Sequence, residues 1–218
     1  ILASHSQVAN GAELNIAQQL AVTVGGNSGE ALQAYIDSGK SIDEVASLYL
    51  HLLSERFGQE GRIIDKSIDM SRFLGLIAAA LPDAPLIWMR RDPLDSAWSC
   101  FRTFFIHGVG WSYDLSDIAH HFSLEDQLLD YWQQRLGRRL LVVPYQELVT
   151  SPEVWTKKLL AHCGLSEEAA PFSPHKTARV VMTASALQVR KPINREGLNV
   201  AQPYIKQMQP FSKAYSHS

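Results

Sequence analysis

Three short and almost wholly apolar segments constrain the fold of this chain more than any other feature. They lie within "GRIIDKS" at 61–67, "APLIWMR" at 84–90 and "RRLLVVPY" at 138–145. Runs of about five residues without polar alternation are typical of parallel strands that are covered on both faces. Helical patterns separate the three runs, as crossover connections between parallel strands require. The sequence therefore predicts an α/β domain with a central parallel sheet between two layers of helices.

Helical patterns with recognisable ends fill most of the remaining chain. The pattern after Ser41 has a serine N-cap, Glu44 three residues later and Gly58 as its stop. Asp92 and Pro93 begin another helix, because Asp is a favoured N-cap and Pro a favoured first helical residue. The first sixty residues are expected to be helical. The predicted helices are 13–24, 28–39, 41–58, 69–81, 92–105, 115–137 and 151–164.

Composition excludes several classes of partner. The net charge of −2 over 218 residues gives no bulk attraction to nucleic acid or to an anionic membrane. No apolar run approaches the roughly 18 residues of a membrane span. The two cysteines, Cys100 and Cys163, suit a reducing compartment such as the cytoplasm, and no histidine spacing is typical of a metal site. We expect no nucleic acid, no membrane and no metal, and the oligomeric state stays open.

A candidate anion site lies where the second apolar run ends. Arg91 follows this run directly, and Ser99 lies on the helix that Asp92 and Pro93 begin. Ligands of open parallel sheets bind beyond the carboxyl ends of the strands, next to helix N-termini that favour negative charge. An arginine, a hydroxyl and a helix N-terminus together suit a phosphate group. The alternative, an ion pair between Arg91 and Asp92 or Asp95, is equally open from the residues alone.

The last fifty residues lose the rhythm of strands and helices. The segment "APFSPHKTARVVMTASALQVRKPINREG" at 170–197 contains five Lys or Arg residues and no acid before Glu196. It reads as a basic loop, a local positive segment in an otherwise slightly acidic chain, and a solvated surface loop would look the same.

The segment "IWMRRDPLDSAWSCF" resembles the 3′-phosphate-binding segment of sulfotransferases that use 3′-phosphoadenosine 5′-phosphosulfate. The resemblance implies that Arg91 and Ser99 hold the 3′-phosphate. "VVPYQELV" is similar to the segment whose tyrosine lies against the adenine, which implies that role for Tyr145, although a tyrosine at the edge of the core would look the same. "TASALQVRKPIN" is similar to the C-terminal segment that closes over the 3′-phosphate, and the residues it implies are Ser185, Arg190 and Lys191.

Two further segments resemble the transfer side of the same family. "IDKSIDMSRFLGLIAAALPDAPLIWM" resembles the stretch whose strand-end lysine faces the sulfuryl group, which implies that role for Lys66. "ILASHSQVANGAEL" is similar to the segment that carries the catalytic base of tyrosyl-protein sulfotransferases, here Glu13. The alternatives are that Glu13 is an acid in the first turn of its own helix and that Lys66 is an exposed lysine. "GVGWSYDLSDIA" and "LLDYWQQRLG" resemble the bacterial branch that is often fused to tetratricopeptide repeats.

The resemblance implies a P-loop-type three-layer fold in a single domain of residues 1–218. Its expected parts are a helical acceptor side at 1–60, a nucleotide-binding core at 61–150 and C-terminal helices with the basic segment at 151–218. The implied reaction moves a sulfuryl group from 3′-phosphoadenosine 5′-phosphosulfate to a hydroxyl or amine of a small-molecule or peptide acceptor, without a metal.

The chain departs from the family pattern at one place. A loop of the type Pro-Arg-Ser-Gly-Thr, which cradles the 5′-phosphosulfate in the family, matches nothing in the sequence, and Ile1–His5 would already belong to the helix after it. The N-terminal strand and loop are therefore expected to be missing. A non-catalytic nucleotide- or partner-binding module with the same fold stays open as an alternative. A nucleotide kinase is disfavoured because no GxxxxGK[ST] occurs.

Overall fold

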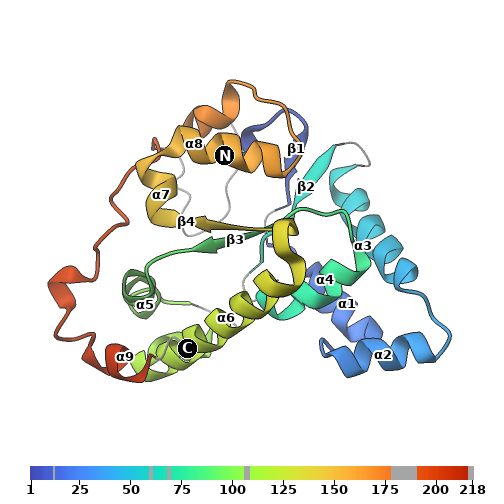
Figure 1. Cartoon of the computed structure of the whole chain (residues 1–218), viewed down its shortest axis with the longest axis horizontal. Helices are drawn as coiled ribbons and strands as arrows, with labels where there is room; N and C mark the ends of the chain where they lie inside the picture. The colour runs from blue at the N-terminus through green and yellow to red at the C-terminus, as the bar shows by residue number, and fades with distance from the viewer. Residues whose placement is uncertain (12, 59–60, 68–69, 106–108, 178–190, 216–218) are drawn as a thin grey trace. The chain divides into compact units, whose positions relative to one another are not determined.

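The computed structural model describes residues 1–11, 13–58, 61–67, 70–105, 109–177 and 191–215 (Figure 1). The chain divides into two compact units, Ile1–Ala84 and Pro85–Ser218. Each unit contains a two-stranded parallel sheet. The boundary falls inside the predicted core at 61–150, and the single domain with its three parts stays a prediction.

The first unit pairs two short strands and packs four helices. Strand β1 (Val8–Asn10) runs parallel to β2 (Arg62–Ile64), with Val8 opposite Arg62 and Asn10 opposite Ile64. Leu20, Val45 and Leu74 are among the side chains that the helices bury. The helices are α1 (Ile16–Val24), α2 (Gly29–Asp37), α3 (Ile42–Phe57) and α4 (Leu74–Ala80), with 3₁₀ turns at Leu2–Ser4 and Met70–Phe73.

Serine caps explain where two of these helices begin. The Ser28 hydroxyl accepts from the Ala31 amide at 3.2 Å, and the Ser41 hydroxyl accepts from the Asp43 amide at 3.1 Å. Gly58 ends α3 with a positive φ of 80°, as its predicted stop position requires. The predicted bounds of α3 are therefore confirmed.

The prediction that the first sixty residues are all helical is wrong at Val8–Asn10. This strand is too short to show a period of its own, and its partner β2 lies about fifty positions further along the chain. Gly11 continues the pairing, since its amide donates to the Ile64 carbonyl at 2.8 Å. A β-carbon on Gly11 would overlap that carbonyl oxygen, so only glycine fits there.

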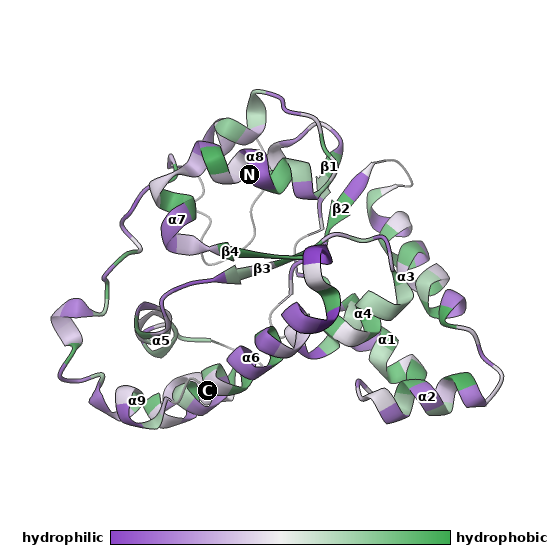
Figure 2. Ribbon diagram, in the orientation of Figure 1, coloured by the Kyte–Doolittle hydropathy of each residue, from purple (hydrophilic) through white to green (hydrophobic). Residues whose placement is uncertain are grey.

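The second unit contains the two longer strands. Strand β3 (Leu86–Arg90) is parallel to β4 (Leu140–Pro144), with Leu86 opposite Leu140 and Arg90 opposite Pro144. Figure 2 shows hydrophobic residues along most of both strands, whereas α6 carries hydrophobic and hydrophilic residues. The helices are α5 (Pro93–Phe101), α6 (Leu115–Leu136), α7 (Tyr145–Thr150), α8 (Pro152–His162) and α9 (Gln209–Ala214).

Helices cover the strands of this unit on both sides. Helices α7 and α8 lie on one side of β3 and β4, and α6 lies on the other (Figure 1). The predicted mixed α/β fold with parallel strands is confirmed. The expected start of α5 is confirmed as well, because the Asp92 carboxylate accepts from the Asp95 amide at 2.8 Å and Pro93 is the first helical residue. Within the predicted loop at 170–197 the described residues contain short 3₁₀ turns at Ala170–Phe172 and Pro174–Lys176, and a further turn at Gln202–Tyr204 and then α9 follow it.

A partly buried polar contact and an apolar cluster hold the C-terminal helix of this unit. Arg90 Nη2 lies 2.8 Å from Asp126 Oδ1 and donates to the Tyr215 hydroxyl at 3.1 Å. The Tyr215 hydroxyl donates in turn to Asp126 Oδ2. Beside this contact the buried side chains of α5, α6 and the C-terminal region form one cluster, which contains Ala97, Leu115, Ile118, Ala119, Met208 and Phe211.

Within the described ranges, none of the helices combines the length and the hydrophobicity that crossing a bilayer demands.

Candidate functional site

The guanidinium of Arg91 is the centre of a cluster just beyond the end of β3. Its Nη1 donates to the Ser99 hydroxyl oxygen on α5 at 3.1 Å. Its Nη2 donates to the carbonyl oxygen of Gly197 at 2.6 Å. The Ser99 hydroxyl donates to the Asp95 carbonyl at 2.8 Å, so its lone pairs face the arginine. The two residues that the sequence singled out as an anion site therefore converge.

The alternative ion pair of Arg91 with Asp92 or Asp95 is wrong. Asp92 caps α5. The Asp95 carboxylate is 5% exposed and accepts from two backbone amides of the C-terminal segment, at 2.7 Å and 3.0 Å. Among the described residues, neither carboxylate forms an ion pair with Arg91. The positive charge beyond β3 is thus not neutralised by the acids beside it in sequence.

Tyr145 lies in this cluster. It is the first residue of α7, directly after β4, and the Arg91 guanidinium carbon lies 5.3 Å from its ring centroid. This distance is typical of a cation–π contact. Gly197 approaches the ring so closely that a β-carbon at this position would overlap the tyrosine hydroxyl. The cluster thus joins the residue after β3 with residues of α5, α7 and the C-terminal segment.

Of the three predicted residues of the basic segment, only Lys191 lies within the described ranges. Lys191 is exposed, and its Nζ lies 3.5 Å from Glu196 Oε2. Ser185 and Arg190 lie outside the described residues. The role of this segment in binding therefore stays a prediction.

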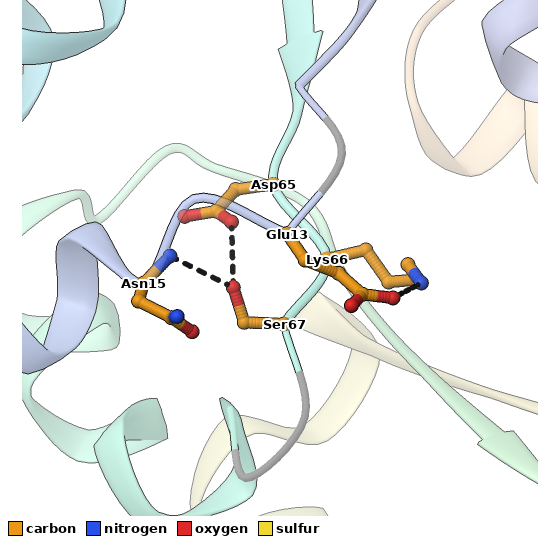
Figure 3. Close-up of polar contacts among 5 residues, drawn as sticks. All are labelled: Glu13, Asn15, Asp65, Lys66 and Ser67. Carbon is orange, nitrogen blue, oxygen red and sulfur yellow. Dashed lines mark hydrogen bonds and ion pairs between the residues drawn. The ribbon is translucent and has the colours of Figure 1, made fainter. Parts of the chain in front are cut away.

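Glu13 and Lys66 meet at the strand ends of the first unit (Figure 3). Lys66 Nζ forms an ion pair with Glu13 Oε1, and the side chains are 63% and 38% exposed respectively. Helix α1 begins at Ile16, so Glu13 precedes it and the reading of Glu13 as a first-turn acid is wrong. Lys66 is exposed, as the alternative to a role in transfer expected, but it forms an ion pair with Glu13. A carboxylate and an ammonium group thus lie side by side just beyond the carboxyl ends of β1 and β2.

A hydrogen-bonded network beside this pair was not predicted. The Ser67 hydroxyl accepts from the Asn15 amide at 3.2 Å and donates to Asp65 Oδ1 at 3.5 Å (Figure 3). The Tyr49 hydroxyl of α3 donates to Asp65 Oδ2 at 2.6 Å. Asn15 has a positive φ of 54°, the left-handed conformation that asparagine tolerates better than most residues.

This network connects the two strand ends that carry the ion pair. Asn15 follows Glu13 by two residues, and Ser67 follows Lys66 directly. The hydrogen bond between Asn15 and Ser67 therefore ties the loop after β1 to the segment after β2. The resemblance had singled out Lys66 at this strand end, but nothing in the sequence pointed to the hydroxyl of Tyr49.

The burial of Asp65 predicts an effect of pH on stability. Burial raises the pKa of Asp65 above its usual value of 3.8, and hydrogen bonds from Tyr49 and Ser67 act in the opposite direction. A carboxyl whose pKa is raised in the folded state stabilises that state below the unfolded pKa, and this contribution is lost as the pH rises through the folded pKa. Wild type should therefore gain stability relative to Asp65→Asn as the pH falls from about 7 to about 4.

Urea unfolding of both proteins across this pH range measures the difference directly. Asp37→Asn, which replaces an exposed carboxylate on α2, is the matched control for loss of a surface charge. A stability difference between wild type and Asp65→Asn that is constant with pH, or that shrinks on acidification, would contradict the prediction.

Comparison with known proteins identifies the family. A model described as "Sulfotransferase family" matches residues 1–169. A protein of Aquifex aeolicus (strain VF5), described as "Uncharacterized protein", is 30% identical over 221 residues, which is 96% of this chain and 29% of that protein. The chain thus spans less than a third of that relative's length.

A solved structure has a similar fold. The "Sulfotransferase Domain from the Curacin Biosynthetic Pathway" superposes with a TM-score of 0.63 over 100% of this chain and 92% of that chain, at 14% sequence identity. At this identity the likeness concerns the fold alone. The family model, in contrast, matches well over half of the sequence, and the chain therefore belongs to the sulfotransferase family.

Proposed function

We propose that the chain takes part in moving a sulfuryl group from 3′-phosphoadenosine 5′-phosphosulfate to a hydroxyl or amine, without a metal. Family membership supports sulfotransferase activity in general. The acceptor is a small molecule or a peptide, and the tyrosyl-protein-like, tetratricopeptide-associated branch is the one its motifs resemble.

The observation that carries the choice of donor is the pairing of Arg91 with Ser99. An arginine that donates to a hydroxyl, with no carboxylate between them, suits a doubly charged phosphate ester. The Nε–H of Arg91 is buried and has no hydrogen-bond partner among the described residues. Buried donors are normally paired, and a phosphate oxygen is a suitable acceptor. The residues thus fit the 3′-phosphate of the donor.

The remaining residues of the nucleotide site follow from this assignment. Tyr145 carries the cation on one face of its ring, and its role is to stack on the adenine. The basic segment with Ser185, Arg190 and Lys191 adds further contacts to the 3′-phosphate. None of these roles requires a metal.

Glu13 and Lys66 supply the groups for transfer. In the reaction the acceptor oxygen or nitrogen forms a bond to sulfur, while the bond from sulfur to the bridging phosphate oxygen breaks. Glu13 takes the proton that the acceptor loses. Lys66 faces the bridging oxygen and neutralises the charge that develops on it, an effect typically worth a few kcal/mol. As in phosphoryl transfer, positioning and charge stabilisation are the main work of the protein.

Thermal unfolding with two nucleotides tests the donor assignment. 3′-Phosphoadenosine 5′-phosphate should stabilise the chain by about 2.7 kcal/mol at a concentration of 100 times its Kd. Adenosine 5′-diphosphate has a comparable charge but no 3′-phosphate, and at the same concentration it should stabilise the chain much less. Equal stabilisation by both nucleotides would remove the case for a 3′-phosphate site.

A transfer assay separates an enzyme from a binding module. Selective binding together with sulfation of an acceptor supports the proposed function. Selective binding without transfer to any of a panel of phenols, amines and tyrosine peptides would instead support the non-catalytic module.

A further inference from the structure

The carboxylate of Asp95 is buried but does not serve its own helix. It lies in the first turn of α5, where an acid usually interacts with the helix N-terminus. Here its Oδ2 accepts from the Asn199 amide at 2.7 Å, and its Oδ1 accepts from the Ala201 amide at 3.0 Å. Both partners lie more than a hundred positions away in the sequence. Asp95 is therefore a long-range contact between α5 and the C-terminal segment.

The backbone of the C-terminal segment is shaped to bind this anion. Asn199 has a positive φ of 56°, which turns nearby amides toward one side of the chain. Successive amides in such a conformation form a concave site for an anion. A buried carboxylate is costly unless it is hydrogen-bonded, and its bonds to amides are stronger than those of a neutral acceptor. Asp95 thus strongly favours the docked position of residues 199–201.

The docked segment also carries a contact to the proposed nucleotide site. Gly197, two residues before Asn199, accepts from Arg91 Nη2 at 2.6 Å. On the other side of Ala201, the ring of Tyr204 stacks on Trp98 of α5 at 4.0 Å between centroids. The segment 197–204 is therefore fastened on both sides of the Asp95 contact, and Arg91 is held between this segment and α5.

We propose that Asp95 is a positioning residue for the 3′-phosphate site. By holding residues 199–201, it keeps the Gly197 carbonyl where it orients the Arg91 guanidinium toward Ser99. This role rests on the proposed function, because it concerns the same nucleotide. Asp95 itself does not touch the ligand.

The test compares two buried carboxylates that both hold the C-terminal part of the chain. Asp95→Asn keeps the shape of the side chain, but it removes the charge and presents an NH₂ group to one of the two amides. The affinity for 3′-phosphoadenosine 5′-phosphate, measured by calorimetry, should fall about tenfold or more, the equivalent of one lost charge-assisted hydrogen bond. The affinity for adenosine 5′-diphosphate should change little.

Asp126→Asn is the matched control. Asp126 is 4% exposed and holds the C-terminal helix through Tyr215 and Arg90, which are not part of the Arg91 cluster. Its replacement should lower the unfolding temperature and leave the ratio of the two nucleotide affinities unchanged. A general loss of stability would affect both variants alike, whereas the proposed role affects selectivity in only one.

A second variant tests the same contact from the other side. In Gly197→Ala the new β-carbon would overlap the Tyr145 hydroxyl, so either the segment at Gly197 or the Tyr145 side chain must shift, while the residues of α5 are unchanged. It too should lose selectivity for the 3′-phosphate, and it decides the question if Asp95→Asn does not fold.

The experiments distinguish a failure of the proposed function from a failure of the positioning role of Asp95. A wild-type chain that binds both nucleotides equally overturns the proposed function, and the role of Asp95 with it. A selective wild type, together with folded variants at Asp95 or Gly197 that remain equally selective, overturns the role of Asp95 alone.

Discussion

Replacing Arg91 with alanine should abolish the preference of the chain for nucleotides with a 3′-phosphate. The guanidinium is the cation that meets the Ser99 hydroxyl, and its two Nη atoms already point to α5 and to the C-terminal segment. Hydrogen bonds to charged groups are worth about 1.5–3 kcal/mol each, so losing one or two of them corresponds to roughly a 100-fold loss of affinity. Calorimetry with 3′-phosphoadenosine 5′-phosphate and with adenosine 5′-diphosphate measures how far the affinity ratio falls.

Two further variants sharpen this result. Arg91→Lys keeps the charge but loses the planar fork, so its selectivity should be intermediate. Arg135→Ala is the matched control, because the Arg135 guanidinium carbon lies 5.2 Å from the ring centroid of Tyr131, much as Arg91 lies over Tyr145. Arg135 is exposed in the last turn of α6 and is not part of the Arg91 cluster. This control should leave the affinity ratio unchanged. If Arg91→Ala has the ratio of wild type, the 3′-phosphate lies elsewhere.

Lys66→Ala should lower the rate of sulfuryl transfer about 100-fold, the cost typical of removing one group that stabilises charge in a transition state. The same variant should bind 3′-phosphoadenosine 5′-phosphate as wild type does, because the proposed 3′-phosphate contacts come from other residues. The effect should therefore appear in kcat rather than in nucleotide affinity. Production of the desulfated nucleotide, with phenols and tyrosine peptides as acceptor probes, is the measurement.

A second exposed lysine controls for loss of a surface ion pair. Lys157 Nζ lies 3.4 Å from Glu153 on α8, and the Lys157 side chain is also half-exposed. Lys157→Ala removes the same kind of charge and should leave the transfer rate within about twofold of wild type, because exposed pairs contribute little. Equal rates for Lys66→Ala and Lys157→Ala would show that Lys66 has no part in the chemistry.

The parts of the fold that the sequence predicted are those set by local signals. Helix α3 begins at a serine cap and ends at a glycine, and α5 begins at Asp92-Pro93. Strands β3 and β4 are long enough for their apolar character to be visible. Strand β1 has three residues and depends on a distant partner. Its pairing with β2 is a tertiary interaction that no short window of sequence contains.

The contacts of the candidate site also differ in how far local sequence predicts them. Arg91 and Ser99 are eight positions apart across a strand–turn–helix, so local geometry nearly fixes their encounter. The contact between Asp95 and residues 199–201 was not predicted, since an acid in a first turn has an adequate local explanation. The pairing of Glu13 with Lys66 joins residues 53 positions apart, and only the resemblance to a family had placed both on the transfer side.

The pairing of β3 with β4 has a consequence for mutagenesis far from the ligand. Arg90 lies opposite Pro144, so the next residues, Arg91 and Tyr145, leave the sheet level with each other. A slip of one residue would displace them by about 3.3 Å and turn one of them to the opposite face. Apolar side chains inside the strands fix this register and thereby set the distance between the guanidinium and the ring. A substitution that removes a methyl group there can weaken nucleotide recognition although every polar residue of the site is unchanged.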